Sequence, residues 1–138
     1  MTALPMTGET APDVLAQRVR AHLRGIAGRA TPITYKALAD ALALTPPNTI
    51  HQVAEALEHL MREDAANGRP FIAALVISKA RGGLPAPGFF DTAQRLGRFA
   101  GDPSGPDASA FHGAALADAA AFWAVAPENR ASEIPEGR

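Results

Sequence analysis

The chain contains no cysteine among its 138 residues. This absence excludes disulfide bonds, thiolate metal sites and a cysteine nucleophile, and it is compatible with a reducing cytosol. No apolar run approaches the roughly 20 residues that a membrane-spanning helix needs, and residues 1–10 lack the basic flank and apolar stretch of a secretory signal. The sequence therefore predicts a soluble, cytoplasmic protein without a membrane partner.

A basic excess is also missing, because 13 Lys and Arg residues face 14 Asp and Glu residues, for a net charge of -1. The charges are nevertheless grouped. Residues 13–36 and 69–98 each carry five basic side chains and one acidic side chain, whereas residues 37–68 carry five acidic and one basic. Phosphate neutralisation dominates the affinity of nucleic-acid-binding proteins. Only separate basic patches of this chain can therefore meet a nucleic acid.

The length fits one domain with a modest core, since 47% of the residues are hydrophobic and many of these are alanine. We expect one winged-helix-like domain with a C-terminal helical extension over residues 10–125. The segments 1–9 and 126–138 are expected to be flexible, and the chain is polar from Pro127 onward.

Apolar side chains at helical spacing predict a first helix that begins at Thr10, where the hydroxyl group can cap the helix. The expected inward stripe consists of Leu15, Val19, Leu23 and Ile26. Gln17, Arg20 and Arg24 fall on the opposite face and are expected to be exposed.

Thr34 is the expected cap of a second helix whose inward residues are Tyr35, Leu38, Ala39 and Leu42. A Pro-Pro turn at residues 45–48 ends it, and a third helix follows over residues 48–66. Its expected core face consists of Ile50, Val53, Ala54, Leu57, Leu60 and Met61. Asn67 and Gly68 form a good stop signal.

Residues 71–78 carry no charge and are rich in Ile, Val and Leu, which favours a buried strand. Its expected partners are residues 33–34 and the segment after Gly82-Gly83. Two more helices are expected, over residues 89–99 with Phe89 or Phe90, Ala93 and Leu96 inward, and over residues 108–125 with Phe111, Ala115, Phe122 and Trp123 as large contacts. The predicted class is α+β, a winged helix-turn-helix core of three helices and a small sheet with two additional C-terminal helices.

The sequence offers no clear catalytic or metal-binding pattern. His51, Glu55 and His59 follow one another at four-residue steps on the third helix, but a solvated helix face explains them more simply than a metal site. The loop of residues 81–88 lacks the Gly-Lys-Ser/Thr ending of a phosphate-binding loop, and its prolines remove amide donors. We therefore expect no cofactor, no metal and no enzymatic activity.

Residues 33–39 (Ile-Thr-Tyr-Lys-Ala-Leu-Ala), residues 51–57 and Pro70 before an apolar run resemble the winged helix-turn-helix of the alkyltransferase-like DNA-repair proteins. The resemblance covers about residues 32–77. It implies the same helix-turn-helix fold, with His51 at the position of that family's arginine finger. The family's reactive Pro-Cys-His-Arg or Pro-Trp-His-Arg motif is replaced here by Pro-Phe-Ile-Ala, which excludes alkyl transfer.

A second resemblance extends further along the chain. The pattern from Pro70 through Gly83-Leu84-Pro85 and Phe89-Phe90 to Phe122-Trp123 is similar to small bacterial proteins of uncharacterised function. It implies no activity, but it places the two C-terminal helices in the same domain.

Two functions remain open. In the first, the chain binds duplex nucleic acid, with base-reading residues on the third helix and phosphate-binding cations around it. The base-reading set is Asn48, Thr49, His51 and Gln52, and the cations are Lys36, Lys79 and Arg81. Glu55 and Glu58 oppose this function by their charge. In the second, the same fold binds another protein or its own copy, as the alternating charge blocks favour.

Overall fold

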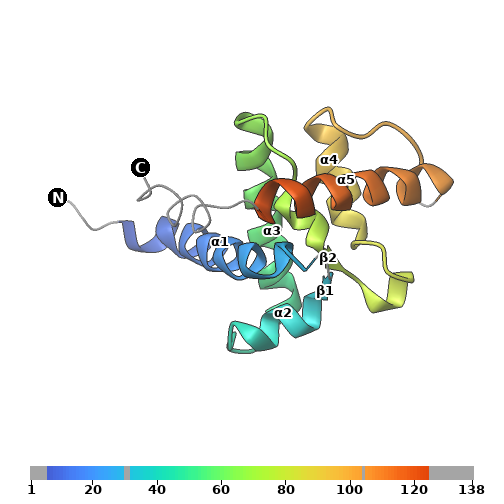
Figure 1. Cartoon of the computed structure of the whole chain (residues 1–138). Helices are drawn as coiled ribbons and strands as arrows, with labels where there is room; N and C mark the ends of the chain where they lie inside the picture. Colours follow the sequence, from blue (N-terminus) through green and yellow to red (C-terminus); the bar gives the residue numbers. More distant parts are fainter. Residues whose placement is uncertain (1–5, 30–31, 104, 125–138) are drawn as a thin grey trace, which may run out of the picture.

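The computed structural model describes residues 6–29, 32–103 and 105–124, with side chains from Val14 onward. This part of the chain forms five α-helices, two short 3₁₀-helices and a two-stranded parallel sheet (Figure 1). In chain order they are α1 (Met6–Ala27), β1 (Ile33–Thr34), α2 (Tyr35–Ala41), α3 (Thr49–Ala66), η1 (Ile72–Leu75), β2 (Val76–Ile77), η2 (Lys79–Arg81), α4 (Pro87–Arg95) and α5 (Pro106–Ala124). The protein is thus mostly helical with a small sheet, in agreement with the α+β class.

Helix α3 organises the packing, because it contacts α1, α2, α4 and η1. Helix α5 lies beside α1 and covers η1 (Figure 1). The buried side chains between these elements form one continuous hydrophobic cluster that runs from α1 to α5. Within the described part of the chain, no helix combines the length and apolar character needed to cross a membrane.

Helix α1 begins at Met6, so Thr10 lies inside the helix and is not its cap. The apolar stripe is largely confirmed, since Val19 and Leu23 are fully buried. The expected exposure of Arg20 is wrong. Its side chain is buried because it pairs with Asp64 of α3. Asp64 lies 44 positions further along the chain, so helical periodicity cannot reveal this contact.

The second and third helices agree closely with the prediction. The Thr34 hydroxyl accepts a hydrogen bond from the Ala37 amide at 3.0 Å, which confirms the cap of α2. The four predicted inward residues of α2 are buried. Helix α3 begins one residue after Asn48 and ends before Asn67. The assignment of Ile50 to its core face is wrong, because Ile50 lies in the first turn of α3 with its side chain 45% exposed.

The expected strand over residues 71–78 is wrong for most of its length. Residues 72–75 form η1, and only Val76 and Ile77 pair with Ile33 and Thr34 in parallel register. Helices enclose this segment, and two of its backbone groups form hydrogen bonds with side chains in place of a neighbouring strand. The Ile72 amide donates to the Asp64 carboxylate at 3.0 Å, and the His112 ring bonds the Ala74 carbonyl at 2.9 Å. The segment after Gly82-Gly83 contributes a single antiparallel bridge, between Ser78 and Leu84.

The two C-terminal helices form with shifted ends. Helix α4 ends at Arg95, and both Phe89 and Phe90 point inward, where they pack with Phe99 and Phe111. Helix α5 begins at Pro106, two residues earlier than predicted. Trp123 is buried, but the prediction that Phe122 is a large core contact is wrong, because its side chain is 42% exposed.

The predicted flexible tail of residues 126–138 lies outside the described residues, as do residues 1–5 of the predicted N-terminal segment.

Candidate interaction groove

A groove of about 540 Å³ opens between α2, the start of α3 and the segment that follows β2. Its volume lies within the range of about 300–1,000 Å³ that is typical of ligand sites. Most of the surface that lines it is apolar. The lining residues are Thr34, Tyr35, Lys36, Ala37, Asp40, Ile50, Ala54, Ser78, Lys79, Ala80 and Ala86.

Local structure fixes the walls of this groove. The Thr34 cap starts α2 at Tyr35, which places one exposed side of the helix along the opening. The Tyr35 hydroxyl accepts a hydrogen bond from the Ala86 amide at 3.0 Å and so ties α2 to the far wall. Burial raises the pKa of Tyr35, although the Ala86 hydrogen bond opposes this effect. Tyr35 therefore remains a neutral, anchored side chain of the groove at neutral pH.

Two cations and one anion line the groove. Lys36 and Lys79 come from opposite walls, and Asp40 lies one turn after Lys36 on α2. Lys36 Nζ and Asp40 Oδ2 are 3.3 Å apart, with side chains 80% and 69% exposed. Such an exposed pair contributes little to stability and can be exchanged for another partner. The groove therefore combines an apolar surface with a small positive excess.

Ile50 is the apolar side chain that the sequence placed in the core and the structure places in the groove. Its spacing to Val53 is that of an inward residue, so periodicity alone predicts burial. Its position in the first turn of α3, close to the end of the helix, is the one signal that favours exposure. An exposed isoleucine beside an apolar groove is typical of a contact surface.

The structure brings together only some of the seven predicted nucleic-acid-binding residues. Lys36 and Lys79 share the groove. Asn48 and Thr49 lie at the start of α3, where Asn48 is exposed in a left-handed conformation and its side chain makes no capping hydrogen bond. Arg81 donates a hydrogen bond to the Pro103 carbonyl at 3.4 Å and does not line the groove.

The remaining two residues have local partners. The Gln52 amide nitrogen donates to the carbonyls of Thr45 and Pro47, at 3.1 and 3.0 Å, and so holds the turn before α3. The His51 ring lies 3.3 Å from the Glu55 carboxylate, and both side chains are exposed. Either residue would have to give up its present contact in order to reach a base edge.

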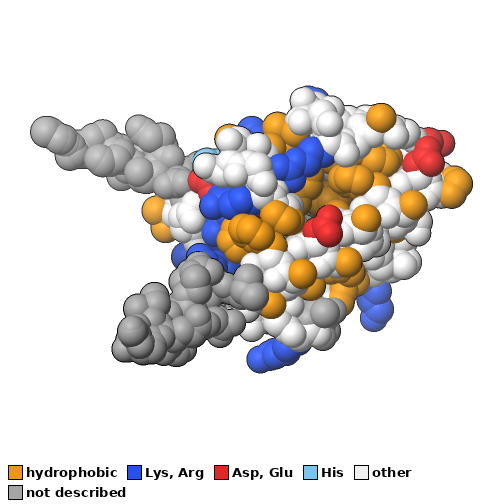
Figure 2. Space-filling model, turned by 45° about the horizontal axis from the view of Figure 1, so that its top comes forward, with side chains coloured by type: hydrophobic (Ala, Val, Ile, Leu, Met, Phe, Trp, Pro, Cys, Tyr) orange, Lys and Arg blue, Asp and Glu red, His pale blue; other side chains and the backbone are white. Residues whose placement is uncertain are grey.

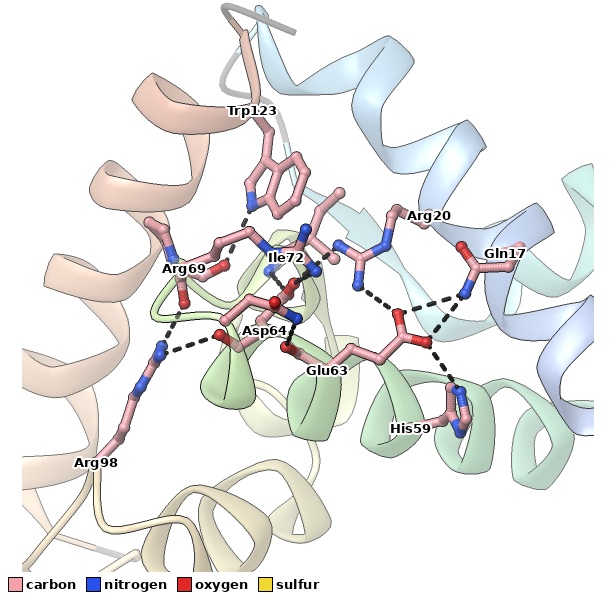
Figure 3. A network of polar contacts seen from close by, with 11 residues as sticks. Gln17, Arg20, His59, Glu63, Asp64, Arg69, Ile72, Arg98 and Trp123 are labelled. Atoms are coloured by element: carbon pink, nitrogen blue, oxygen red, sulfur yellow. Dashed lines mark hydrogen bonds and ion pairs between the residues drawn. The ribbon is translucent and has the colours of Figure 1, made fainter. Parts of the chain in front are cut away.

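A buried polar network lies apart from the groove, and sequence reasoning missed it (Figure 3). Asp64 of α3 is fully buried and accepts hydrogen bonds from Arg20 at 2.9 Å and from the Ile72 amide at 3.0 Å, and it pairs with Arg69 at 3.0 Å. Burial raises the pKa of Asp64, and the Ile72 amide and the two guanidinium groups oppose this effect. No local pattern in the sequence signals a contact among segments so far apart.

The network continues to the neighbouring carboxylate and to the tryptophan. Burial tends to raise the pKa of Glu63, but hydrogen bonds from Arg20 and Gln17 lower it overall. The Trp123 indole donates to the Pro70 carbonyl at 3.2 Å, and its ring faces the guanidinium groups of Arg20, Arg24 and Arg69 at 5.0, 5.7 and 5.3 Å. These contacts join α1, α3 and α5 into one unit, which is a structural role.

Other features of the described residues offer less to a ligand. A second cavity, lined among others by Arg98 and Asp118, measures only about 130 Å³. Among the described side chains, no three His, Asp or Glu residues cluster as a metal site would require. On the face drawn in Figure 2, hydrophobic side chains alternate with separate basic and acidic ones. That face presents no continuous basic surface to a nucleic acid.

Comparison with known proteins adds no relative. No family model, no curated protein and no solved structure matches this chain.

Proposed function

We propose that this chain is a non-enzymatic interaction module whose groove binds an extended protein segment with a large apolar side chain and acidic flanks. The observation that carries the proposal is the composition of the groove. Its lining is mostly apolar, includes an Ile50 side chain that is 45% exposed, and places Lys36 and Lys79 on opposite walls. An apolar side chain fits between the walls, and acidic neighbours fit the lysines.

The arrangement of the surrounding elements supports a winged-helix-like scaffold for this module. Residues 42–48 connect α2 to α3, and β2, η2 and the Ser78–Leu84 bridge form a short wing-like projection beside them. Winged helices serve nucleic-acid and protein recognition alike, so the groove and not the scaffold decides between these functions.

Nucleic-acid binding is the second candidate, and one observation favours it. Lys36 and Lys79 lie near the exposed start of α3, where Asn48 and Thr49 are also found. Phosphates, however, gain nothing from an apolar lining, and the local bonds of Gln52 and His51 compete with base contacts. Glu55 and Asp40 add negative charge on the same side.

Isothermal titration calorimetry on the full chain tests the proposal. The probe is a hexapeptide in which leucine and phenylalanine are flanked on each side by two acidic residues. Lys36→Glu together with Lys79→Glu should weaken its binding by about tenfold or more, because both complementary charges are reversed. Arg62→Glu with Arg95→Glu, which changes the net charge equally at exposed sites outside the groove lining, should leave the affinity within about twofold.

Equal losses in the two double variants would reject the groove as the binding surface. Binding of a random DNA duplex that falls steeply with salt, combined with no binding of the peptide, would instead establish the nucleic-acid function.

A further inference from the structure

The C-terminal sequence contains a segment with the chemistry that the groove requires. Beyond Val125 the chain is polar, and Ile134 is its only Val, Leu, Ile, Met or aromatic residue. Glu133 precedes Ile134 directly, and Glu136 follows two positions later. An isolated large apolar side chain between two carboxylates matches an apolar groove with one lysine on each wall.

The point where this tail leaves the fold lies close enough to the groove. A methyl group at Gly28, just after α1, would lie 3.9 Å from Cβ of Ala124, the last residue of α5. Six residues separate Gly28 from Thr34 in the groove wall, so that distance is at most about 22 Å. Ten residues separate Ala124 from Ile134, and they span up to about 33 Å when extended. The tether therefore reaches the groove with chain to spare.

We infer that residues 133–136 of the chain's own C-terminal tail occupy the groove, with Ile134 against the apolar lining and the two glutamates toward Lys36 and Lys79. This inference rests on the proposed function of the same groove. The tail acts as an internal competitor, so an external partner binds only by displacing it.

Two physical effects make such docking favourable even when the contact itself is weak. A proline disfavours helical backbone at the residue before it, so Pro135 favours the extended backbone at Ile134 that docking requires. A short tether also holds the segment at an effective concentration of about millimolar, so a groove of comparable affinity is about half filled. Lys36 can pair with a tail glutamate in place of Asp40, because their present ion pair is exposed.

Paramagnetic relaxation enhancement in the full chain tests this contact directly. The chain has no cysteine, so Gly137→Cys provides a single site for a nitroxide label. The label should broaden the amide signals of Ala37 and Ala80 in the groove walls. It should spare residues 96–100 after α4, an end that lies across the molecule from α2 in Figure 1.

Matched variants separate the docked segment from random motion of the tail. Ile134→Asp should reduce the selective broadening several-fold, whereas Ala131→Asp, which adds the same charge outside the segment, should preserve it. Broadening that is absent, or equal in the two variants, overturns the inference. Broadening that arises only between labelled and unlabelled molecules in a mixed sample also overturns it, because a second copy would then supply the tail.

The acidic hexapeptide distinguishes failure of this inference from failure of the proposed function. If the tail occupies the groove, Ile134→Asp should tighten peptide binding about twofold or more relative to Ala131→Asp. Peptide binding that depends on Lys36 and Lys79 but is unchanged by Ile134→Asp rejects the tail and keeps the groove. No peptide binding to any variant, including Ile134→Asp, rejects both.

Discussion

At the scale of single residues, Asp64 is a fully buried acid that three donors hold in place. Donors from α1, from the turn after α3 and from η1 converge on its buried carboxylate. The sequence shows Asp64 as one more acid on a polar helix, because its partners come from distant segments. For Ile50 the error has the opposite sign, since periodicity predicted burial whereas its side chain is 45% exposed in the groove lining.

Asp64→Ala should lower the free energy of unfolding by about 3–5 kcal/mol, because it removes the buried carboxylate that Arg20, Arg69 and the Ile72 amide share. Urea denaturation followed by circular dichroism measures this change. Asp40→Ala, which removes an acid from an exposed pair, should change stability by no more than about 0.5 kcal/mol. Similar values for the two variants would show that the buried network does not stabilise the fold.

The lowered pKa of the buried His112 side chain makes the stability of the fold depend on pH. Burial lowers its pKa below the ordinary value of 6.5, and its Nε2 contacts the Ala74 carbonyl. The unfolded chain therefore takes up the proton more readily, and the contribution of His112 is complete above pH 6.5 and is lost as the pH falls through the folded-state pKa. His112→Gln should flatten the decline of the unfolding free energy on acidification, measured by urea titrations at several pH values.

His51→Gln serves as the control for this measurement, because His51 is exposed. A steep acid decline that persists unchanged in His112→Gln would contradict the assignment.

At the scale of elements, local sequence signals predicted a helix end well where the residues at that end determine it. The Thr34 cap and the Asn67-Gly68 stop predicted the start of α2 and the end of α3 correctly, whereas α2 ends at Ala41, before the Pro-Pro turn of residues 45–48. The run at residues 71–78 was different, because composition and length favour a strand whereas the surrounding helices decide its backbone. Side chains of Asp64 and His112 bond groups that a neighbouring strand would otherwise pair with.

Leu57 and Ile50 on α3 provide a matched test of which side of this helix faces the core. Leu57 is 4% exposed, so Leu57→Ala should lower the free energy of unfolding by about 2–5 kcal/mol. Ile50→Ala should have a much smaller effect, because its side chain is 45% exposed. Thermal unfolding of both variants measures the difference. A larger loss for Ile50→Ala would mean that α3 is rotated from the orientation described.

At the scale of the whole molecule, the groove depends on three segments that the sequence keeps apart: the start of α2, the first turn of α3 and the chain after β2. The sequence predicted the helices and singled out Lys36 and Lys79, but not the apolar surface between them. That surface exists because Tyr35 holds Ala86 across the opening and because Ile50 is left uncovered. Neither the Tyr35–Ala86 hydrogen bond nor the exposure of Ile50 can be predicted from the sequence of a single element.

In the proposed function, this groove recognises an apolar side chain with acidic neighbours. An amide-resolved NMR titration of the full chain with the acidic hexapeptide tests it most directly. The predicted result is a set of saturable shifts at Ala37, Ile50 and Ala80, with the amides of residues 96–100 unchanged. Shifts spread evenly over the molecule, or shifts at the start of α3 that appear with a DNA duplex and not with the peptide, would contradict the claim.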